Sequence, residues 1–325
     1  MQQSMDWSRI RRQLPEANQS PGVYASLDDL IRVRFKARDF SFMPRQPVTS
    51  ILSGRYASRL RGRGLNFEEM RRYLPGDDVR TIDWRVTART RQPHVRVYTE
   101  EKDRAVLLLV DQRANMFFGS RDRMKSVTAA ELAALGAWRA LDAGDRVGAV
   151  VFNDTEVTDL RPQRSQQAVM SILGTVVEMN QRLRVGTDIE PNPGMLNEAL
   201  RKAVRLAPHD VLVVIISDFF GVDSETERLS ASLARHNDVL GLLVHDPLRL
   251  NPHGHSISVS DGKLQMQMDL GNKKVREKLA EDYRLEQERI THFLKKLSAP
   301  LLLVSNEGDV VKQVRRLLGV PARGA

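Results

Sequence analysis

Cysteine is absent from the 325-residue sequence. Disulfides, thiol catalysis and cysteine-ligated metal sites are therefore excluded, and the absence fits a reducing compartment. Aromatic residues are also scarce, at 6%, whereas hydrophobic residues as a whole reach 41%. The chain can thus build a core, and that core must be largely aliphatic.

Long apolar runs are missing as well. The longest, at residues 106–110 and 211–216, are too short to span a bilayer, and the first 30 residues lack the apolar stretch of a signal peptide. We therefore expect a cytoplasmic protein without a transmembrane segment. Its length indicates two domains, or one domain with substantial extensions.

Lysine is missing from the most basic part of the chain. Between Gly54 and Arg96 there are eleven Arg, no Lys and five acids, so this segment carries +6 of the net charge of +9. Arginine without lysine favours forked, geometric pairing over diffuse charge. An acidic partner or a nucleic acid is one interpretation, and an internal network of Arg–Asp pairs is the other.

The part of the chain before Asp103 predicts short elements separated by turns. Residues 1–53 have the character of a variable N-terminal arm, in which residues 26–38 show the charge order of a short capped helix. For the Arg-rich segment, residues 54–103, the pattern predicts a helix over 65–74, a turn at Pro75-Gly76, a short helix around Asp83-Trp84 and a strand over 94–101.

From Asp103 onward strands and helices alternate. Continuous apolar runs predict buried strands at 105–111 and 211–218, and both runs end in an acid. The alternation predicts a doubly wound, mostly parallel α/β domain over residues 104–325. The other expected elements are strands at 146–152, 238–246 and 301–305, hairpins at 156–162 and around Asp261-Gly262, and helices at about 123–142, 165–180, 193–206, 224–236, 273–298 and 308–318.

Two acids stand where such a domain binds ligands. Asp111 and Asp218 each end a predicted strand, and ligands bind beyond the carboxyl ends of strands, where the strand order reverses. The loop 186–188, Gly-Thr-Asp, can meet them at the same edge and form a polar crevice. Two carboxylates and a hydroxyl suit Mg²⁺. The alternative is that the acids cap helices or pair with arginine.

The chain resembles a von Willebrand factor A-type domain in three runs, VLLLVDQRANM, GTD and IISDFFG. The resemblance implies a metal-dependent adhesion site whose two Asp and one Thr fall on Asp111, Asp218 and Thr187. The two Ser positions of that site are occupied by Arg113 and Asn115. A guanidinium cannot coordinate a cation and would pair with Asp111 or Asp218 instead, so the implied Mg²⁺ site is degenerate. Its remaining candidate ligands are Asp111, Asn115, Thr187 and Asp218.

The Arg-rich segment resembles the signature of an uncharacterised bacterial family, domain-of-unknown-function family 58. Between Gly62 and Thr90 the chain contains, in order, G-x-G, Phe, R-x-Y, P-G-D-D-x-R, I-D-W and A-R-T, with Asn66 where an acid is usual. The resemblance covers roughly residues 50–245. It implies a basic module joined to an A-type domain, often encoded beside a MoxR-type AAA+ ATPase. That ATPase or its client is the expected protein partner.

Two interpretations of the Arg-rich segment stay open. Its acids and arginines are close in sequence, and bidentate pairs between them would hold a segment with little hydrophobic core. In that case Trp84 would anchor the segment against the sheet. In the other interpretation the segment is a binding face. The candidate residues are Arg72, Asp77, Asp78, Arg80, Asp83, Trp84, Arg85 and Arg89.

We expect a non-enzymatic protein-interaction module that uses Arg113 to pair with an incoming acidic side chain. A nucleic-acid-binding protein is the alternative, disfavoured by the interleaved acids. A phosphate-chemistry enzyme built on Asp111 and Asp218 is the third possibility, but no nucleophile is evident. The run at 119–126, GSRDRMKS, lacks the Gly before Lys that a phosphate loop requires.

Overall fold

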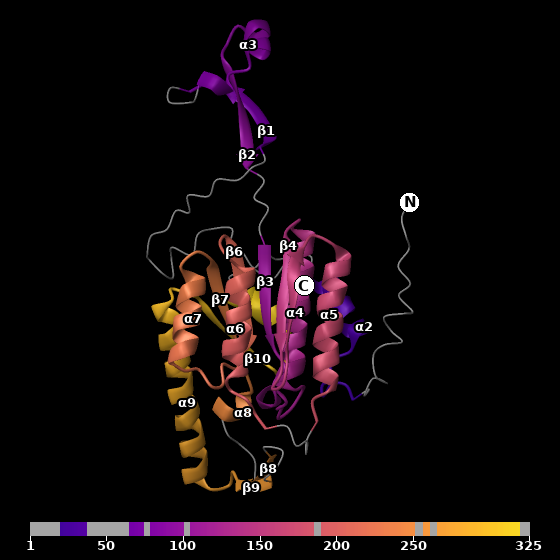
Figure 1. The fold of residues 1–325 in the computed structure, drawn as a ribbon, viewed down its shortest axis with the longest axis vertical. Coiled ribbons are helices and arrows are strands. Elements are labelled where there is room, and N and C mark those ends of the chain that lie inside the picture. The colour runs from indigo at the N-terminus through magenta and orange to yellow at the C-terminus, as the bar shows by residue number, and fades with distance from the viewer. Residues whose placement is uncertain are drawn as a thin grey trace. The chain divides into compact units, whose positions relative to one another are not determined.

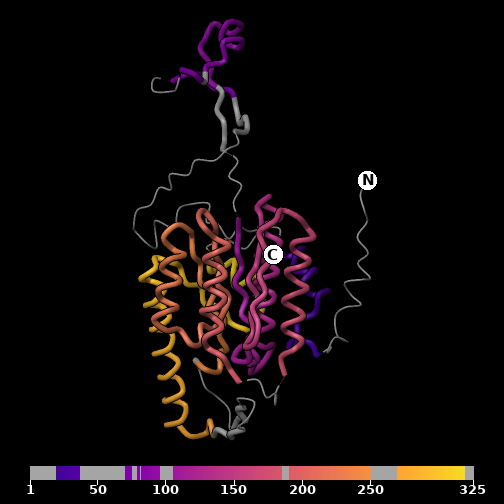
Figure 2. Tube along the Cα trace, viewed as in Figure 1, coloured from indigo at the N-terminus to yellow at the C-terminus, as the bar shows by residue number. Residues whose placement is uncertain are grey.

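The computed structural model describes residues 20–37, 65–74, 79–100, 105–184, 190–250, 256–260 and 265–318. The chain divides into two compact units (Figures 1 and 2). Residues 53–103 form the smaller unit, and residues 1–52 together with 104–325 form the larger one. Among the described residues, no helix has the length and apolar character needed to cross a membrane.

The larger unit contains a six-stranded sheet in the order β10-β7-β6-β3-β4-β5. Neighbouring strands run parallel from β10 to β4, and β5 pairs antiparallel with β4 at one edge. This is the doubly wound, mostly parallel sheet that the alternating pattern predicts. The strands are β3 (Ala105–Asp111), β4 (Arg146–Phe152), β5 (Val157–Gln163), β6 (Val211–Ser217), β7 (Asp238–His245) and β10 (Leu301–Ser305).

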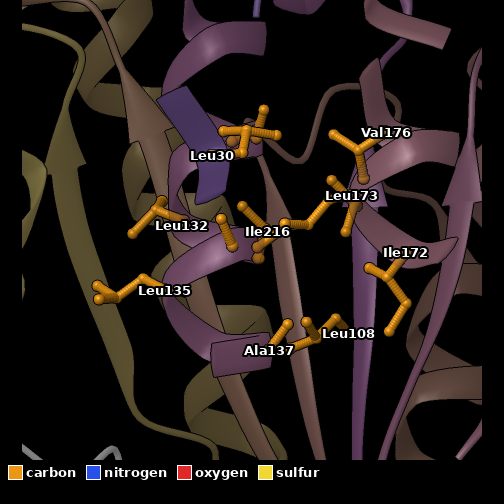
Figure 3. Packing of buried hydrophobic residues seen from close by; sticks show 14 of the residues in the cluster. Leu30, Leu108, Leu132, Leu135, Ala137, Ile172, Leu173, Val176 and Ile216 are labelled. Carbon is orange, nitrogen blue, oxygen red and sulfur yellow. The ribbon is translucent and has the colours of Figure 1, made fainter. Parts of the chain in front are cut away.

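Helices cover both faces of the sheet, so all seven residues of β3 are buried. Leu108 belongs to the cluster that includes Leu132 and Leu173 (Figure 3), whereas Leu107 faces the opposite cluster. The first cluster is built from α2 (Leu27–Ala37), α4 (Lys125–Asp142), α5 (Gln166–Gln181) and α10 (Val310–Leu317), and the second from α6 (Met195–Leu206), α7 (Ser224–Ala234) and α9 (Lys273–Lys296).

Helix α2 is part of this core, although the sequence suggests only a variable arm around it. Leu30 is buried against α4, and the indole Nε1 of Trp138 donates to the Leu30 carbonyl at 3.1 Å. Just before the helix, the amide of Ala25 donates to Asn180 Oδ1 at 2.7 Å. The predicted short helix is therefore confirmed, and its apolar face packs into the core of the larger unit.

The smaller unit is a hairpin with a short helix. Strand β1 (Leu65–Arg72) pairs antiparallel with β2 (His94–Glu100), and between them lie η1 (Val79–Thr81) and α3 (Trp84–Thr90). The helix predicted over 65–74 is wrong. An isolated ten-residue helix is marginal, whereas pairing with β2 gives the same backbone a ladder of partners on both sides of a bulge between Phe67 and Glu69. The predicted turn at Pro75-Gly76 lies outside the described residues.

The remaining elements follow strands β3 and β7 in the sequence. They are η2 (Ala114–Met116) after β3, α8 (Pro247–Leu250) after β7, and the antiparallel pair β8 (Ser256–Ser260) and β9 (Gln265–Asp269). The last pair confirms the predicted hairpin, although its turn at Asp261-Gly262 lies outside the described residues.

Candidate functional site

The strand order brings Asp111 and Asp218 together. Strands β3 and β6 are parallel neighbours with Val110 opposite Ile216, so the two acids follow at the same edge of the sheet. The chain runs from β3 outward through β4 and β5, and then returns to the other side of β3 with β6. The two acids therefore flank the point where the strand order reverses, as the sequence predicts.

Asp111 forms a buried, two-pronged ion pair with Arg113. The guanidinium Nη2 lies 2.7 Å from Oδ2 and Nε lies 3.0 Å from Oδ1, and both side chains are inaccessible to solvent. Ser217 adds a hydroxyl, whose Oγ donates to Oδ2 of Asp111 at 2.6 Å. Burial would lower the pKa of Arg113, but Asp111 raises it, so the guanidinium stays charged.

The rest of the Arg113 guanidinium is used inside the protein. Its Nη1 donates to the carbonyls of Pro193, at 3.3 Å, and Phe220, at 3.2 Å. Arg113 thereby connects the end of β3 to two loops that are 80 and 107 residues away. Our expectation that an incoming acid pairs directly with Arg113 does not hold in this arrangement, because the guanidinium is 0% exposed and already paired.

Asp218 pairs with a different cation, Lys125. Lys125, at the first position of α4, places Nζ 2.5 Å from Oδ2, and Asn115 Nδ2 donates to Oδ1 at 2.7 Å. Burial by itself would raise the pKa of Asp218, but Lys125, Arg113 and Asn115 outweigh it and lower the pKa to about 2. Sequence reasoning missed Lys125. The available signal was a Lys at the start of the helix that follows a buried strand.

A third acid, Asp154, was also missed. It follows β4, and its two carboxylate oxygens accept from backbone amides, Oδ2 from Ala114 at 2.6 Å and Oδ1 from Asn192 at 2.8 Å. Asp154 thus holds the start of η2 and the loop that precedes α6. We call the charged side chains described so far, together with the amide of Asn115, the strand-end site: Asp111, Arg113, Asn115, Lys125, Asp154 and Asp218.

The strand-end site does not have the donor set of a divalent-metal site in this arrangement. A cation at Asp111 would have to displace a two-pronged guanidinium, and a cation at Asp218 would have to displace an ammonium. Thr187, the remaining candidate ligand, lies outside the described residues, as does Asp188. Among the described residues, no group of three or more acids or histidines gathers to hold a metal ion.

The Arg-rich segment is placed only in part. Asp83 is buried and caps α3, accepting from the amides of Arg85 at 2.9 Å and Val86 at 3.1 Å. Trp84 is 70% exposed within the smaller unit, and its role as an anchor against the sheet stays a prediction. Asp77 and Asp78 lie outside the described residues. The arginine candidates, Arg72, Arg80, Arg85 and Arg89, have exposed side chains.

The fold and the site define a doubly wound α/β domain whose strand-order switch is filled by acid–cation pairs of its own side chains. The chain belongs to the family described as protein of unknown function DUF58, whose family model matches residues 69–289. It is 28% identical over 290 residues to uncharacterised proteins of Mycobacterium tuberculosis and Mycobacterium bovis, with 89% of each chain covered.

Two solved structures are similar in fold. The conserved hypothetical protein BatB from Bacteroides thetaiotaomicron aligns with 66% of this chain and 97% of its own, at 15% identity and a TM-score of 0.40. A von Willebrand factor type A protein from Catenulispora acidiphila aligns with 68% of this chain and 42% of its own, at 12% identity and a TM-score of 0.36. The fold class itself rests on the strand order and connections of this chain.

Proposed function

We propose that this protein is a non-enzymatic interaction module that binds a protein partner at the rim of the strand-end site, without a divalent ion. The rim consists of two loops, residues 191–194 and 218–221. The observation that carries the proposal is that the strand-end ion pairs hold these loops while leaving the ring of Phe220 at the surface, 40% exposed.

The rim is held by contacts on every side of Phe220. Its carbonyl accepts from Arg113, and its amide donates to Asp218 Oδ1 at 3.0 Å. Gly221 has φ of +83°, and a Cβ there would come within 2.3 Å of Pro193, so the two rim loops touch where only glycine fits. A loop whose backbone is held this way loses little backbone freedom on binding, which favours affinity.

The same contacts argue against catalysis. Each of the three acids at the site is engaged by a cation or by backbone amides, so none is placed as a free general base. The cavity that lies under α4, at the opposite ends of the strands and lined in part by Leu108, Leu132 and Leu212, has a volume of only about 30 Å³. That is room for water rather than for a substrate.

One buried atom at the site still lacks a partner. Oδ1 of Asn115 has no hydrogen-bond partner among the described groups, although Nδ2 of the same amide holds Asp218. A buried acceptor without a partner costs free energy, and a donor that reached it when a protein binds would recover that cost. For the partner we propose a MoxR-type AAA+ ATPase or a client of one, on the basis of the family resemblance.

The test is binding of the full chain to the purified MoxR-type ATPase of the same organism, measured by calorimetry with ATP, without ATP and with chelator. We expect Phe220→Ala to weaken binding by about tenfold or more, as loss of an apolar anchor does. Leu285→Ala is the matched control, because Leu285 is 49% exposed on α9 and belongs to neither rim loop. We expect this control and the chelator to have no effect.

Two results would refute the proposal. One is binding that the chelator abolishes, because the site would then work through a metal. The other is binding that Phe220→Ala leaves unchanged while its thermal unfolding matches the wild type, because the rim would then not be the contact.

A further inference from the structure

The smaller unit carries a second candidate interaction surface, which is built from residues outside the strand-end site. Trp84 is 70% exposed, Leu74 60% and Val79 59%. Most exposed apolar residues in soluble proteins are scattered singly, whereas these three large ones lie within eleven residues of chain, which is typical of an interaction surface. We call Leu74, Val79 and Trp84 the distal patch.

The backbone of the smaller unit places the distal patch at one end of its hairpin. The amide of Tyr73 donates to the Pro93 carbonyl at 2.9 Å, and the amide of Asp83 donates to the His94 carbonyl at 2.9 Å. Residues 74 and 84 therefore both leave the hairpin at its Arg72–His94 end, opposite to the end at Leu65 and Glu100. Figure 1 shows α3 at this end of the hairpin.

Hydrogen bonds, rather than a core, hold the patch in position. Asp83 caps α3, the amide of His94 donates to Thr87 Oγ1 at 3.1 Å, and Ile82 bridges to Val95. Among the side chains described in this unit, only Asp83 and Val95 are buried. Backbone and capping hydrogen bonds thus hold α3 in position, and the packing of the unit does not depend on the exposed indole of Trp84.

The charge around the patch is strongly positive. The exposed arginines Arg85, Arg89 and Arg91 lie on or next to α3, and Arg72 lies at the end of β1. The whole run from Gly54 to Arg96, with all five of its acids counted, is still +6. A partner must therefore be acidic, and arginine forks bind carboxylates in pairs.

We infer that the distal patch docks an acidic segment of a protein partner that also carries an apolar side chain, which packs against Trp84. Trp and Arg are the residues that dominate binding energy at protein interfaces. A single-stranded nucleic acid is disfavoured, because Trp84 is the one exposed aromatic among the side chains described in this unit. Leu74 and Val79 cannot stack on bases, whereas nucleic-acid platforms stack successive bases on successive aromatics.

The experiment uses the full chain and a fluorescein-labelled peptide of Glu-Glu-Leu repeats, with fluorescence anisotropy as the readout. The comparison probes are a peptide of Gln-Gln-Leu repeats and an oligothymidine of matched charge. We expect the Glu-Glu-Leu peptide to bind at least about tenfold more tightly than either. We expect Trp84→Ala to weaken binding about tenfold or more, and the double variant Arg85→Glu/Arg89→Glu to abolish it.

Matched controls separate this surface from the rest of the molecule. The double variant Arg161→Glu/Arg205→Glu makes the same charge change at exposed arginines of the larger unit, and we expect it to bind normally. Phe220→Ala should also bind the peptide normally, which distinguishes this surface from the rim of the strand-end site. Circular dichroism of each variant checks folding.

The inference is overturned if the Glu-Glu-Leu peptide does not bind, or if Trp84→Ala binds it as the wild type does. Tighter binding of oligothymidine would identify the patch as a nucleic-acid surface instead. Equal loss in the Arg161→Glu/Arg205→Glu control would show attraction to net charge rather than docking at the patch.

Discussion

Arg113 and Lys125 supply, from within the chain, the positive charge that Asp111 and Asp218 need at the strand ends. All four side chains are more than nine-tenths buried, so each acid without its cation would be an uncompensated charge in a poorly solvated position. The pairs also reach outward, because Arg113 and Asp218 both bond to the backbone of Phe220. At the residue scale, the ion pairs that neutralise the buried acids therefore also fix the backbone of the rim.

Removing one member of a pair should cost much more than removing both. We expect Arg113→Ala to lower the free energy of unfolding by about 3–5 kcal/mol, because Asp111 is left buried and unpaired. The double variant Arg113→Met/Asp111→Leu should recover most of that loss, because neither member of this pair is then left as an unpaired buried charge. Urea unfolding at neutral pH measures both variants. A loss below about 1 kcal/mol in Arg113→Ala would contradict the buried pair.

Asp218 should make stability depend on acid pH. Its folded pKa of about 2 lies below the value of about 3.9 for an unfolded Asp, so the folded state favours the carboxylate. The stabilisation, on the order of 2 kcal/mol, is complete above about pH 4 and is lost as the pH falls toward about 2.

We expect the fall in unfolding free energy over that pH window to be shallower in Asp218→Asn than in the wild type, as measured by urea unfolding at a series of pH values. Asp210→Asn, at an exposed acid, is the control that should keep the wild-type slope. Parallel slopes for the wild type and Asp218→Asn would show that Asp218 does not carry this dependence.

At the scale of elements, a chain of buried amides connects α2 to the strand-end site. Asn180 at the end of α5 accepts from the amide of Ala25 and donates to Gln112 Oε1 at 2.8 Å, and Gln112 Nε2 donates to the Ser126 carbonyl at 3.0 Å. The segment before α2 and the start of α4 are thus joined through two side chains. Such networks stabilise only when every member is satisfied.

Asn180→Leu should therefore loosen α2. The change keeps the volume similar but leaves the Ala25 amide and Gln112 Oε1 buried without partners, at a cost of about 1–3 kcal/mol for each group. We expect lower unfolding free energy and faster hydrogen exchange or proteolysis within residues 25–37, measured by mass spectrometry. Ser171→Leu, on the exposed side of α5, is the control. Unchanged exchange in α2 would show that the amide chain does not hold it.

At the scale of the whole molecule, the smaller unit is an insertion between two parts of the larger one. Residues 1–52 and 104–325 form one compact unit, and the core cluster includes Leu30 of α2 together with residues of β3 and α4. A single core built from both sides of the insertion predicts that the larger unit folds without the smaller one.

We expect replacement of residues 53–103 by a flexible Gly-Ser linker to leave the main thermal transition within about 3 °C of the full chain, as measured by calorimetry. The double variant Leu30→Ala/Leu132→Ala is the contrast, because it changes the shared core and should lower the transition strongly. If the linker variant lost its cooperative transition, the two units would have to be one folding unit.

The sequence by itself determined the larger unit well. Apolar runs of strand length, alternating with amphipathic helices, specify β3, β6 and the doubly wound class. A parallel strand that is buried on both faces needs apolar residues at nearly every position, so its sequence shows a continuous apolar run. Because each of these runs ends in an acid and the two strands are parallel, the sequence was enough to predict that Asp111 and Asp218 lie at one edge of the sheet. The sequence left two carboxylates as possible partners of Arg113, Asp111 and Asp218, and the structure pairs it with Asp111.

Only the tertiary structure decided what surrounds those acids. Lys125 and Asp218 are 93 residues apart and Asp154 and Asn192 are 38 apart, so no local pattern relates them. The burial of Arg113 and the strand at 65–72 in place of a helix have the same cause. Each depends on a partner or a covering surface supplied by a distant part of the chain, and packing energy there outweighs local propensity.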